Sequence, residues 1–256
     1  MTEHYLNSLR THDITLPNRA ADIPGEWLEQ VAKGWEEFDA ESRDIAVSTA
    51  AKMRGRSAGK FLLSVAALTG EESSTTAAEA LLLHPDCPDG NTLLAAAQPI
   101  KDPMTRFHLY RAAGAHGAAV NIFEPIAAKE TNVDARQAAL EAMARLGHLP
   151  SLHTLYERVE KATAAEVTVL HDALIYVGDR RLATALIPWL HKTDPVSRMG
   201  SDRSPAMVRQ CDYALWTAHL LSIGVTLPAN RIDNYSPATL AAAKPVLLAL
   251  PDLPVA

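Results

Sequence analysis

Three glycines recur at nearly even spacing through the middle of the chain, each at the end of a predicted helix. Gly114, Gly147 and Gly178 lie 33 and 31 residues apart, and Gly70 and Gly224 follow apolar runs of the same kind, AALTG and LLSIG. Glycine readily adopts the left-handed conformation that often ends a helix. A period of about 30 residues made of helix–turn–helix units is typical of stacked helical hairpins, so the spacing predicts an α-solenoid.

The most regular stretch runs from Thr131 to about Lys192 and reads as four consecutive helices. Apolar residues recur in it with a period near 3.6 residues, as expected for helices with one buried face. The expected N-terminal caps are Thr131 with Asp134, Ser151, Thr163 with Glu166, and Asp179. The sequence therefore predicts two complete hairpins here.

Composition points to the same fold class. The chain contains 44 alanines among 256 residues, whereas aromatic residues make up only 5%. Alanine is the strongest helix former, and strands favour β-branched and aromatic residues, so we expect an all-α protein. Outside the regular stretch, single helices are predicted over 26–39, 74–83 and 91–97. Two helical pairs are predicted, 41–53 with 57–68 and 102–113 with 118–129. A polar loop is predicted after Lys192, then a long helix, and a last helix from Ser236 to about Leu250.

Parts of the regular stretch resemble a known repeat family. Ala135–Gly147, ARQAALEAMARLG, is similar to the first helix of a short HEAT-like repeat, and Asp179–Trp189, DRRLATALIPW, to the second helix; residues 208–215 resemble the start of another unit. The resemblance implies a right-handed HEAT- or armadillo-like superhelix forming one domain over 1–256. Its expected parts are irregular helical pairs in 1–130, the clearest repeats in 131–222 and a C-terminal capping helix in 223–256.

The charge is unevenly distributed along the chain. The net charge is −6, and all of the excess acid lies in the first half: residues 1–60 carry 8 basic and 10 acidic groups, 61–130 carry 4 and 8, and the rest carry 12 of each. Proteins that bind nucleic acid usually present a basic surface, which disfavours DNA or RNA as a partner. We expect a protein partner with a basic surface, bound by a monomer or weak oligomer.

The cysteines and the N-terminal residues indicate the cellular compartment in which the protein is expected. Cys87 and Cys211 are far apart and are expected to be reduced. The N-terminal residues do not resemble a signal peptide, and no apolar run reaches the length of a membrane span. The expected location is the cytoplasm.

No catalytic motif stands out in the sequence. The ten histidines include His84 near Cys87, but they show no metal-ligand spacing, so neither a metal nor a cofactor is expected. The run Gly55–Lys60 resembles a phosphate-binding loop, yet it has one residue too few between its glycines, and Phe61 replaces the Ser or Thr that would contact magnesium. The run is therefore expected to be a turn. HEAT-like enzymes, a bilin lyase or a DNA glycosylase, remain the alternative to a protein without catalytic activity.

The sequence favours a protein-binding module, an adaptor or an inhibitor such as a bacterial immunity protein, acting through its concave or acidic face. Tryptophan and arginine dominate the binding energy of protein interfaces. Trp35 and Trp189 lie on predicted core stripes, whereas Trp216 lies just off the apolar stripe of its helix. The candidate partner-binding residues are Arg198, Arg203 and Arg209 around the polar loop, Trp216, and the pair Arg180 and Arg181.

Overall fold

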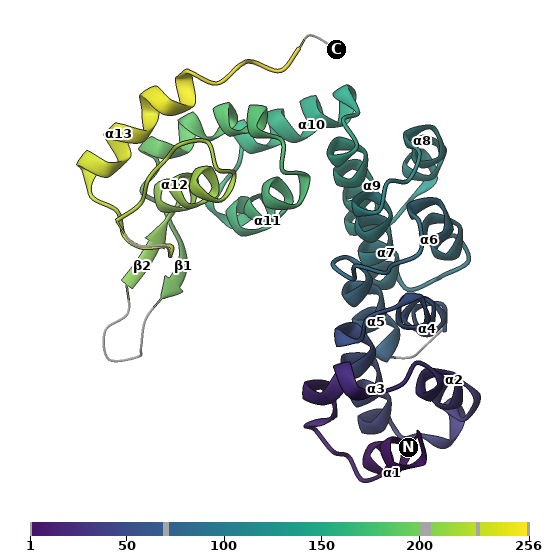
Figure 1. Cartoon of the computed structure of the whole chain (residues 1–256). Coiled ribbons are helices and arrows are strands. Elements are labelled where there is room, and N and C mark those ends of the chain that lie inside the picture. Colours follow the sequence, from purple (N-terminus) through teal and green to yellow (C-terminus); the bar gives the residue numbers. More distant parts are fainter. Residues whose placement is uncertain (1, 69–71, 200–205, 229–230, 255–256) are drawn as a thin grey trace. The chain divides into compact units, whose positions relative to one another are not determined.

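The computed structural model describes residues 2–68, 72–199, 206–228 and 231–254 (Figure 1). Most of these residues are helical, as the composition predicts, and the strands described form a two-stranded hairpin. The chain divides into two compact units, Met1–Leu146 and Gly147–Ala256. This division falls inside the segment 131–222. Within the described ranges, no helix combines the length and the apolar character needed to cross a membrane.

Unit 1, Met1–Leu146, is a succession of short helices. In order they are α1 (Thr2–Arg10), the 3-10 helix η1 (Leu16–Asp22), α2 (Glu26–Lys33), the 3-10 helix η2 (Trp35–Glu37), α3 (Ala40–Lys52), α4 (Arg56–Ala66), α5 (Glu72–Leu81), α6 (Gly90–Ala97), α7 (Pro103–Ala115), α8 (Val120–Lys129) and α9 (Val133–Arg145). Most helices expected from the sequence are present with small differences at their ends, but the helix expected over 26–39 is divided at Gly34 into α2 and η2, and α1 and η1 were not predicted.

The helices of unit 1 form two rows (Figure 1). In one row α3 packs on α5, α5 on α7 and α7 on α9; helices α2, α4, α6 and α8 lie alongside. The helices of the first row begin 32, 31 and 30 residues apart, so the period seen between Gly114 and Gly178 extends back to α3. The expected pair α3 and α4 is in contact, but α4 packs more extensively on α5; α7, expected to pair with α8, packs mainly on α9, α6 and α5.

Buried ion pairs join the last two helices of the first row to their surroundings. The Arg111 guanidinium of α7 contacts the Glu141 carboxylate of α9 at 3.0 Å, with side chains 14% and 3% exposed. Arg106 of α7 binds Glu130, which follows α8, through two nitrogens at 2.8 and 2.9 Å. Such bidentate pairs fix both distance and orientation, so they set the register of α7 against its neighbours.

Unit 2, Gly147–Ala256, combines helices with the hairpin. Its elements are α10 (Leu149–Glu160), η3 (Ala164–Glu166), α11 (Val167–Val177), η4 (Arg180–His191), β1 (Pro195–Met199), β2 (Ala206–Arg209), α12 (Gln210–Leu220) and α13 (Pro237–Leu248). The predicted fourth helix of the regular stretch is η4, a 3-10 helix, with Trp189 completely buried as expected.

Several predicted helix ends are confirmed. The capping box of Thr163 and Glu166 is present, the Asp179 side chain accepts the Arg181 backbone N–H, and Gly178 adopts a left-handed φ of 71° at the end of α11. Ser236 caps α13 by accepting the N–H of Thr239. These ends depend on contacts within a few residues, which is why the sequence identifies them.

Two predicted caps are wrong. Asn132, and not Thr131, caps α9, because its side chain accepts the Ala135 N–H at 3.0 Å. Ser151 lies inside α10, which begins after His148. In both places the chain offers a second polar side chain within three residues, so sequence alone does not decide between the candidates.

The polar loop expected after Lys192 is wrong in part, because Pro195–Met199 and Ala206–Arg209 form the antiparallel strands β1 and β2, while 200–205 lie outside the described residues. Ser197 pairs with Val208, and Arg198 pairs with Met207. Successive side chains of a strand point to opposite faces. Val208 is buried and the Ser197 hydroxyl lies 3.1 Å from the Tyr213 hydroxyl of α12, so one face of the hairpin packs on α12 and the other faces solvent.

Candidate functional site

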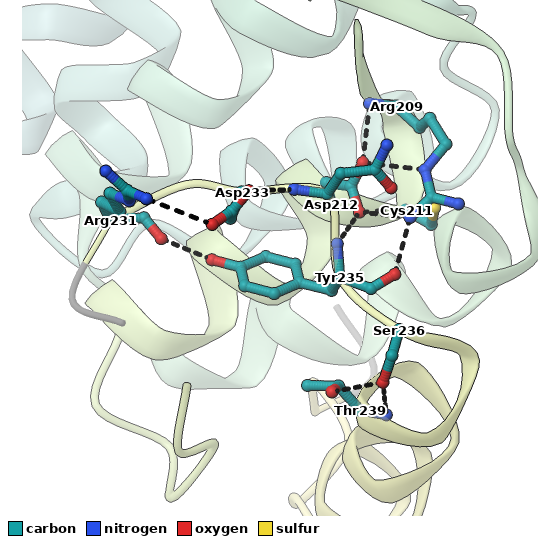
Figure 2. Close-up of polar contacts among 9 residues, drawn as sticks. Arg209, Cys211, Asp212, Arg231, Asp233, Tyr235, Ser236 and Thr239 are labelled. Atoms are coloured by element: carbon teal, nitrogen blue, oxygen red, sulfur yellow. Dashed lines mark hydrogen bonds and ion pairs between the residues drawn. The ribbon is translucent and has the colours of Figure 1, made fainter. Parts of the chain in front are cut away.

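One predicted site residue, Arg209, lies just before α12, where a buried carboxylate joins three segments (Figure 2). Asp212 is fully buried. It accepts the Arg209 backbone N–H at 2.8 Å, the Arg209 Nε at 2.9 Å and Nη2 at 2.8 Å, and the Tyr235 backbone N–H at 2.9 Å. Four donors use the whole acceptor capacity of one carboxylate. We call Arg209, Asp212 and Tyr235 the Asp212 clamp.

The clamp continues into the segment that leads to α13. Arg209 also donates from Nη2 to the Tyr235 carbonyl at 2.8 Å, and the Tyr235 hydroxyl donates to the Arg231 carbonyl at 2.7 Å (Figure 2). Farther out, Arg231 and Asp233 form an exposed ion pair of 3.6 Å. The clamp therefore holds the end of β2, the first turn of α12 and residues 231–236 together.

The ionisation of the groups in and beside the clamp follows from these contacts. The hydrogen bonds from Arg209 to Asp212 raise the pKa of the arginine above its ordinary value, which keeps it charged. Burial raises the pKa of Tyr235 to about 12 and also raises the pKa of the Cys211 thiol. At neutral pH the tyrosine and the thiol are therefore uncharged. The arrangement stabilises a fold, because its acceptors are already occupied by protein donors.

The structure gives the predicted binding residues different surroundings. Arg209 is engaged in the Asp212 clamp, and Arg181 binds the cap residue Asp179 through its Nε at 3.0 Å and its Nη2 at 2.5 Å. Arg180 and Arg198 are exposed. Arg203 lies outside the described residues. Of the four arginines within the described ranges, Arg180 and Arg198 present their guanidinium groups to solvent.

Trp216 is half-buried, and its ring stacks on His219 with centroids 5.7 Å apart. Arg198 does not share its surface: Ser197 points toward α12, so the next side chain of the strand, Arg198, points away from the helix that carries Trp216. Arg198 instead lies beside Met207, which is 44% exposed, on the outer face of the hairpin. The predicted set is therefore not one patch.

The acidic charge gathers in unit 1. Residues 1–146 carry 20 acidic and 14 basic groups, which gives the whole net charge of −6, and the remaining 10 of each cancel in unit 2. The segment 26–44 holds seven acidic and two basic side chains. The exposed acidic residues there are Glu26, Glu29, Glu36, Glu37, Asp39, Glu41 and Asp44. We call these seven residues the acidic segment.

Sequence reasoning missed a set of histidines that join neighbouring helical pairs. The His84 Nε2 donates to the Met53 carbonyl at 3.1 Å, and the His116 Nε2 lies 2.9 Å from the Leu81 carbonyl. Each histidine follows one helix of the first row and reaches the end of the preceding one. His84, His116 and His148 are spaced 32 residues apart, and this interval could have revealed the repeat in the first half of the chain.

The surroundings of His84 fix its tautomer. Since a carbonyl accepts from Nε2, and Nδ1 accepts the Asp86 backbone N–H at 3.2 Å, the neutral ring carries its proton on Nε2. Burial lowers the pKa of His84. This histidine is therefore a neutral structural link.

Among the described residues, no group of three His, Cys, Asp or Glu side chains could hold a metal ion. Cys87 is half-buried and Cys211 is buried, and both are free thiols. The chain matches no protein-family model, no curated protein and no solved structure.

Proposed function

We propose that the chain is a HEAT-like α-solenoid protein that binds another protein through the acidic surface of unit 1. The observation that carries the proposal is the combination of stacked helical pairs, repeating every 30 to 32 residues, with a net charge of −6 confined to that unit. Stacked repeats present extended surfaces to partners. The acidic segment supplies a surface complementary to a basic one.

The physical basis is charge complementarity on a rigid support. Side chains of the acidic segment stand on α2, η2 and α3, whose opposite sides are held in the core by residues such as Trp27 and Trp35. Opposite charges on two partners speed their encounter and disfavour wrong partners. A rigid surface also loses little conformational entropy on binding. A cytoplasmic inhibitor of a basic toxin is the most specific form of this proposal.

The test compares two charge-reversed proteins as baits in a native lysate. Glu26 and Glu29 are exposed residues of α2, and Glu160 and Asp252 are exposed residues of unit 2. We expect Glu26→Lys with Glu29→Lys to lose the main partner, and Glu160→Lys with Asp252→Lys to keep it. A toxin or nuclease as that partner would establish the inhibitor form. Equal capture by both variants would contradict the proposed surface.

A further inference from the structure

A cavity of about 290 Å³ lies beside the acidic segment, where α2 and η2 meet α4. We call it the Trp35 cavity. Its floor is apolar: Trp35 packs edge-on against Phe61 of α4 with ring centroids 5.9 Å apart, and Val65 lies one helical turn farther along α4. The exposed Ala32 and the half-buried Leu68 complete the apolar lining. The cavity therefore offers apolar contacts that the chain's own side chains leave unfilled.

Trp35 is fixed by Arg43 of α3 as well as by Phe61. The Arg43 guanidinium carbon lies 5.4 Å from the centre of the Trp35 ring, and its Nε donates to the Trp35 carbonyl at 3.2 Å. The same guanidinium contacts Glu36 at 3.5 Å; the Arg43 side chain is 16% exposed, whereas that of Glu36 is 88% exposed. The cavity wall is thus held in place before any partner arrives, and the carboxylate stands at the surface while the cation lies beneath it.

The side of the Trp35 cavity formed by α2 and η2 is acidic overall. Lys33 and Glu36 line it, and Glu29 lies one helical turn before Lys33 on the same side of α2. Residues 26–37 carry four carboxylates and one cation, and all five side chains are exposed. A cationic group that approaches this side therefore meets more opposite charge than like charge.

The α4 side of the Trp35 cavity is uncharged in the part of the chain that the structure describes, because α4 contributes Ser64 and apolar residues there. The cations Arg56 and Lys60 of α4 line a separate cavity of about 670 Å³ toward the turn before α6. Asp86 and Asp89 line that larger cavity too, so it favours neither sign of charge. The electrostatic preference of the Trp35 cavity is therefore set by α2 and η2.

We propose that the Trp35 cavity receives one apolar side chain of the basic partner, and that Lys or Arg residues flanking this side chain contact the carboxylates of α2 and η2. The inference rests on the proposed function and specifies which segment of the partner binds. Pockets for whole small molecules measure about 300–1,000 Å³, so this smaller cavity suits a single side chain. Interfaces are commonly centred on such an anchor in a pocket, with a polar rim around it.

The test uses two defined peptides as probes. They are capped, labelled pentapeptides in which lysines surround a central leucine or a central serine, and their binding to the full-length protein is measured by fluorescence anisotropy at low salt. We expect the leucine peptide to bind about tenfold more tightly, because only leucine buries apolar surface in the cavity.

Filling the cavity should remove this preference. Ala32 lines the cavity and is exposed, so Ala32→Trp places an indole there without changing the charge of the protein. We expect this variant to bind the two peptides equally. The matched control is Ala95→Trp, an exposed position of α6 that lines neither cavity, and it should keep the tenfold preference of the wild type. Circular dichroism checks that each variant is folded.

Charge reversal separates this proposal from the proposed function. Glu26→Lys with Glu29→Lys should weaken the binding of both peptides about fivefold. Glu160→Lys with Asp252→Lys in unit 2 should change neither affinity. If charge reversal in unit 1 weakens binding but the wild type binds both peptides equally, the cavity proposal is overturned and the acidic surface stands. A leucine preference that survives in Ala32→Trp would also overturn the cavity proposal. If charge reversal in unit 1 changes neither affinity, the proposed function is contradicted as well.

Discussion

Replacing Asp212 with asparagine tests whether the clamp holds unit 2 together. The substitution keeps the shape of the side chain but removes its charge and turns one acceptor toward Arg209 into a donor. Removing one partner of a buried ion pair destabilises a protein by about 3–5 kcal/mol. Because the Arg209 side chain is 23% exposed and can regain water, we expect the lower end, about 3 kcal/mol.

The assay combines urea unfolding with amide hydrogen exchange. The free energy of unfolding of unit 2 should fall by about 3 kcal/mol. The Tyr235 amide, which donates to Asp212, should also exchange faster, because its acceptor is weakened. The control is Asp233→Asn in the same segment (Figure 2): its ion pair with Arg231 spans 3.6 Å with side chains 73% and 47% exposed, so we expect a change below about 0.5 kcal/mol.

Two results would refute this reasoning. If Asp212→Asn changed the free energy of unfolding no more than Asp233→Asn, the buried carboxylate would not stabilise the fold. If stability fell but exchange at Tyr235 did not change, the loss would arise elsewhere, and the clamp would not be what joins α12 to the segment before α13.

Three further predictions concern unit 1. Burial lowers the pKa of His84, so as the pH falls the histidine is protonated in the unfolded chain before it is protonated in the folded one. The free energy of unfolding should therefore decrease below about pH 6.5. His84→Gln should reduce this pH dependence, as measured by urea unfolding between about pH 7 and about pH 5. A pH profile identical in the variant would contradict this. A Cβ at Gly59 would lie 2.3 Å from the Asp86 carbonyl oxygen, so Gly59→Ala should destabilise the fold by about 1–3 kcal/mol. A Cβ at Gly34 would lie 3.5 Å from its nearest neighbour, so Gly34→Ala should change stability little. Equal effects of the two variants in thermal melts would count against close contact between α4 and the turn at Asp86. Burial raises the pKa of the Cys87 thiol to about 12, so iodoacetamide should label Cys87 at neutral pH only after unfolding. Rapid labelling of the folded protein would show that burial does not keep the thiol protonated.

The sequence predicts what depends on neighbours along the chain. The capping box of Thr163 and Glu166 and the left-handed Gly178 are confirmed because each involves contacts within a few residues. The hairpin β1–β2 was missed because its pairing depends on the packing of Val208 and Ser197 against α12. The short strands carry too few β-formers to be identified alone.

The contacts of the candidate site are likewise predictable only where they join residues that are close in sequence. Arg209 and Asp212 are three residues apart, so their ion pair could have been expected from the sequence. That the carboxylate is fully buried and also accepts the Tyr235 N–H depends on residues 23 positions away, which no local pattern reveals. The cavity lined by Arg56 and Lys60 likewise depends on residues 86–92, about 30 positions away, although the two basic residues themselves are visible in the sequence.

The most direct test of the proposed function is capture of the partner from native lysate at about 0.1 M and about 1 M salt, between which the screening length falls from about 10 Å to about 3 Å. The account predicts one stoichiometric protein with a basic surface, retained at low salt and largely lost at high salt. A partner retained equally at both concentrations, or a captured nucleic acid in place of a protein, would contradict binding through the acidic surface of unit 1.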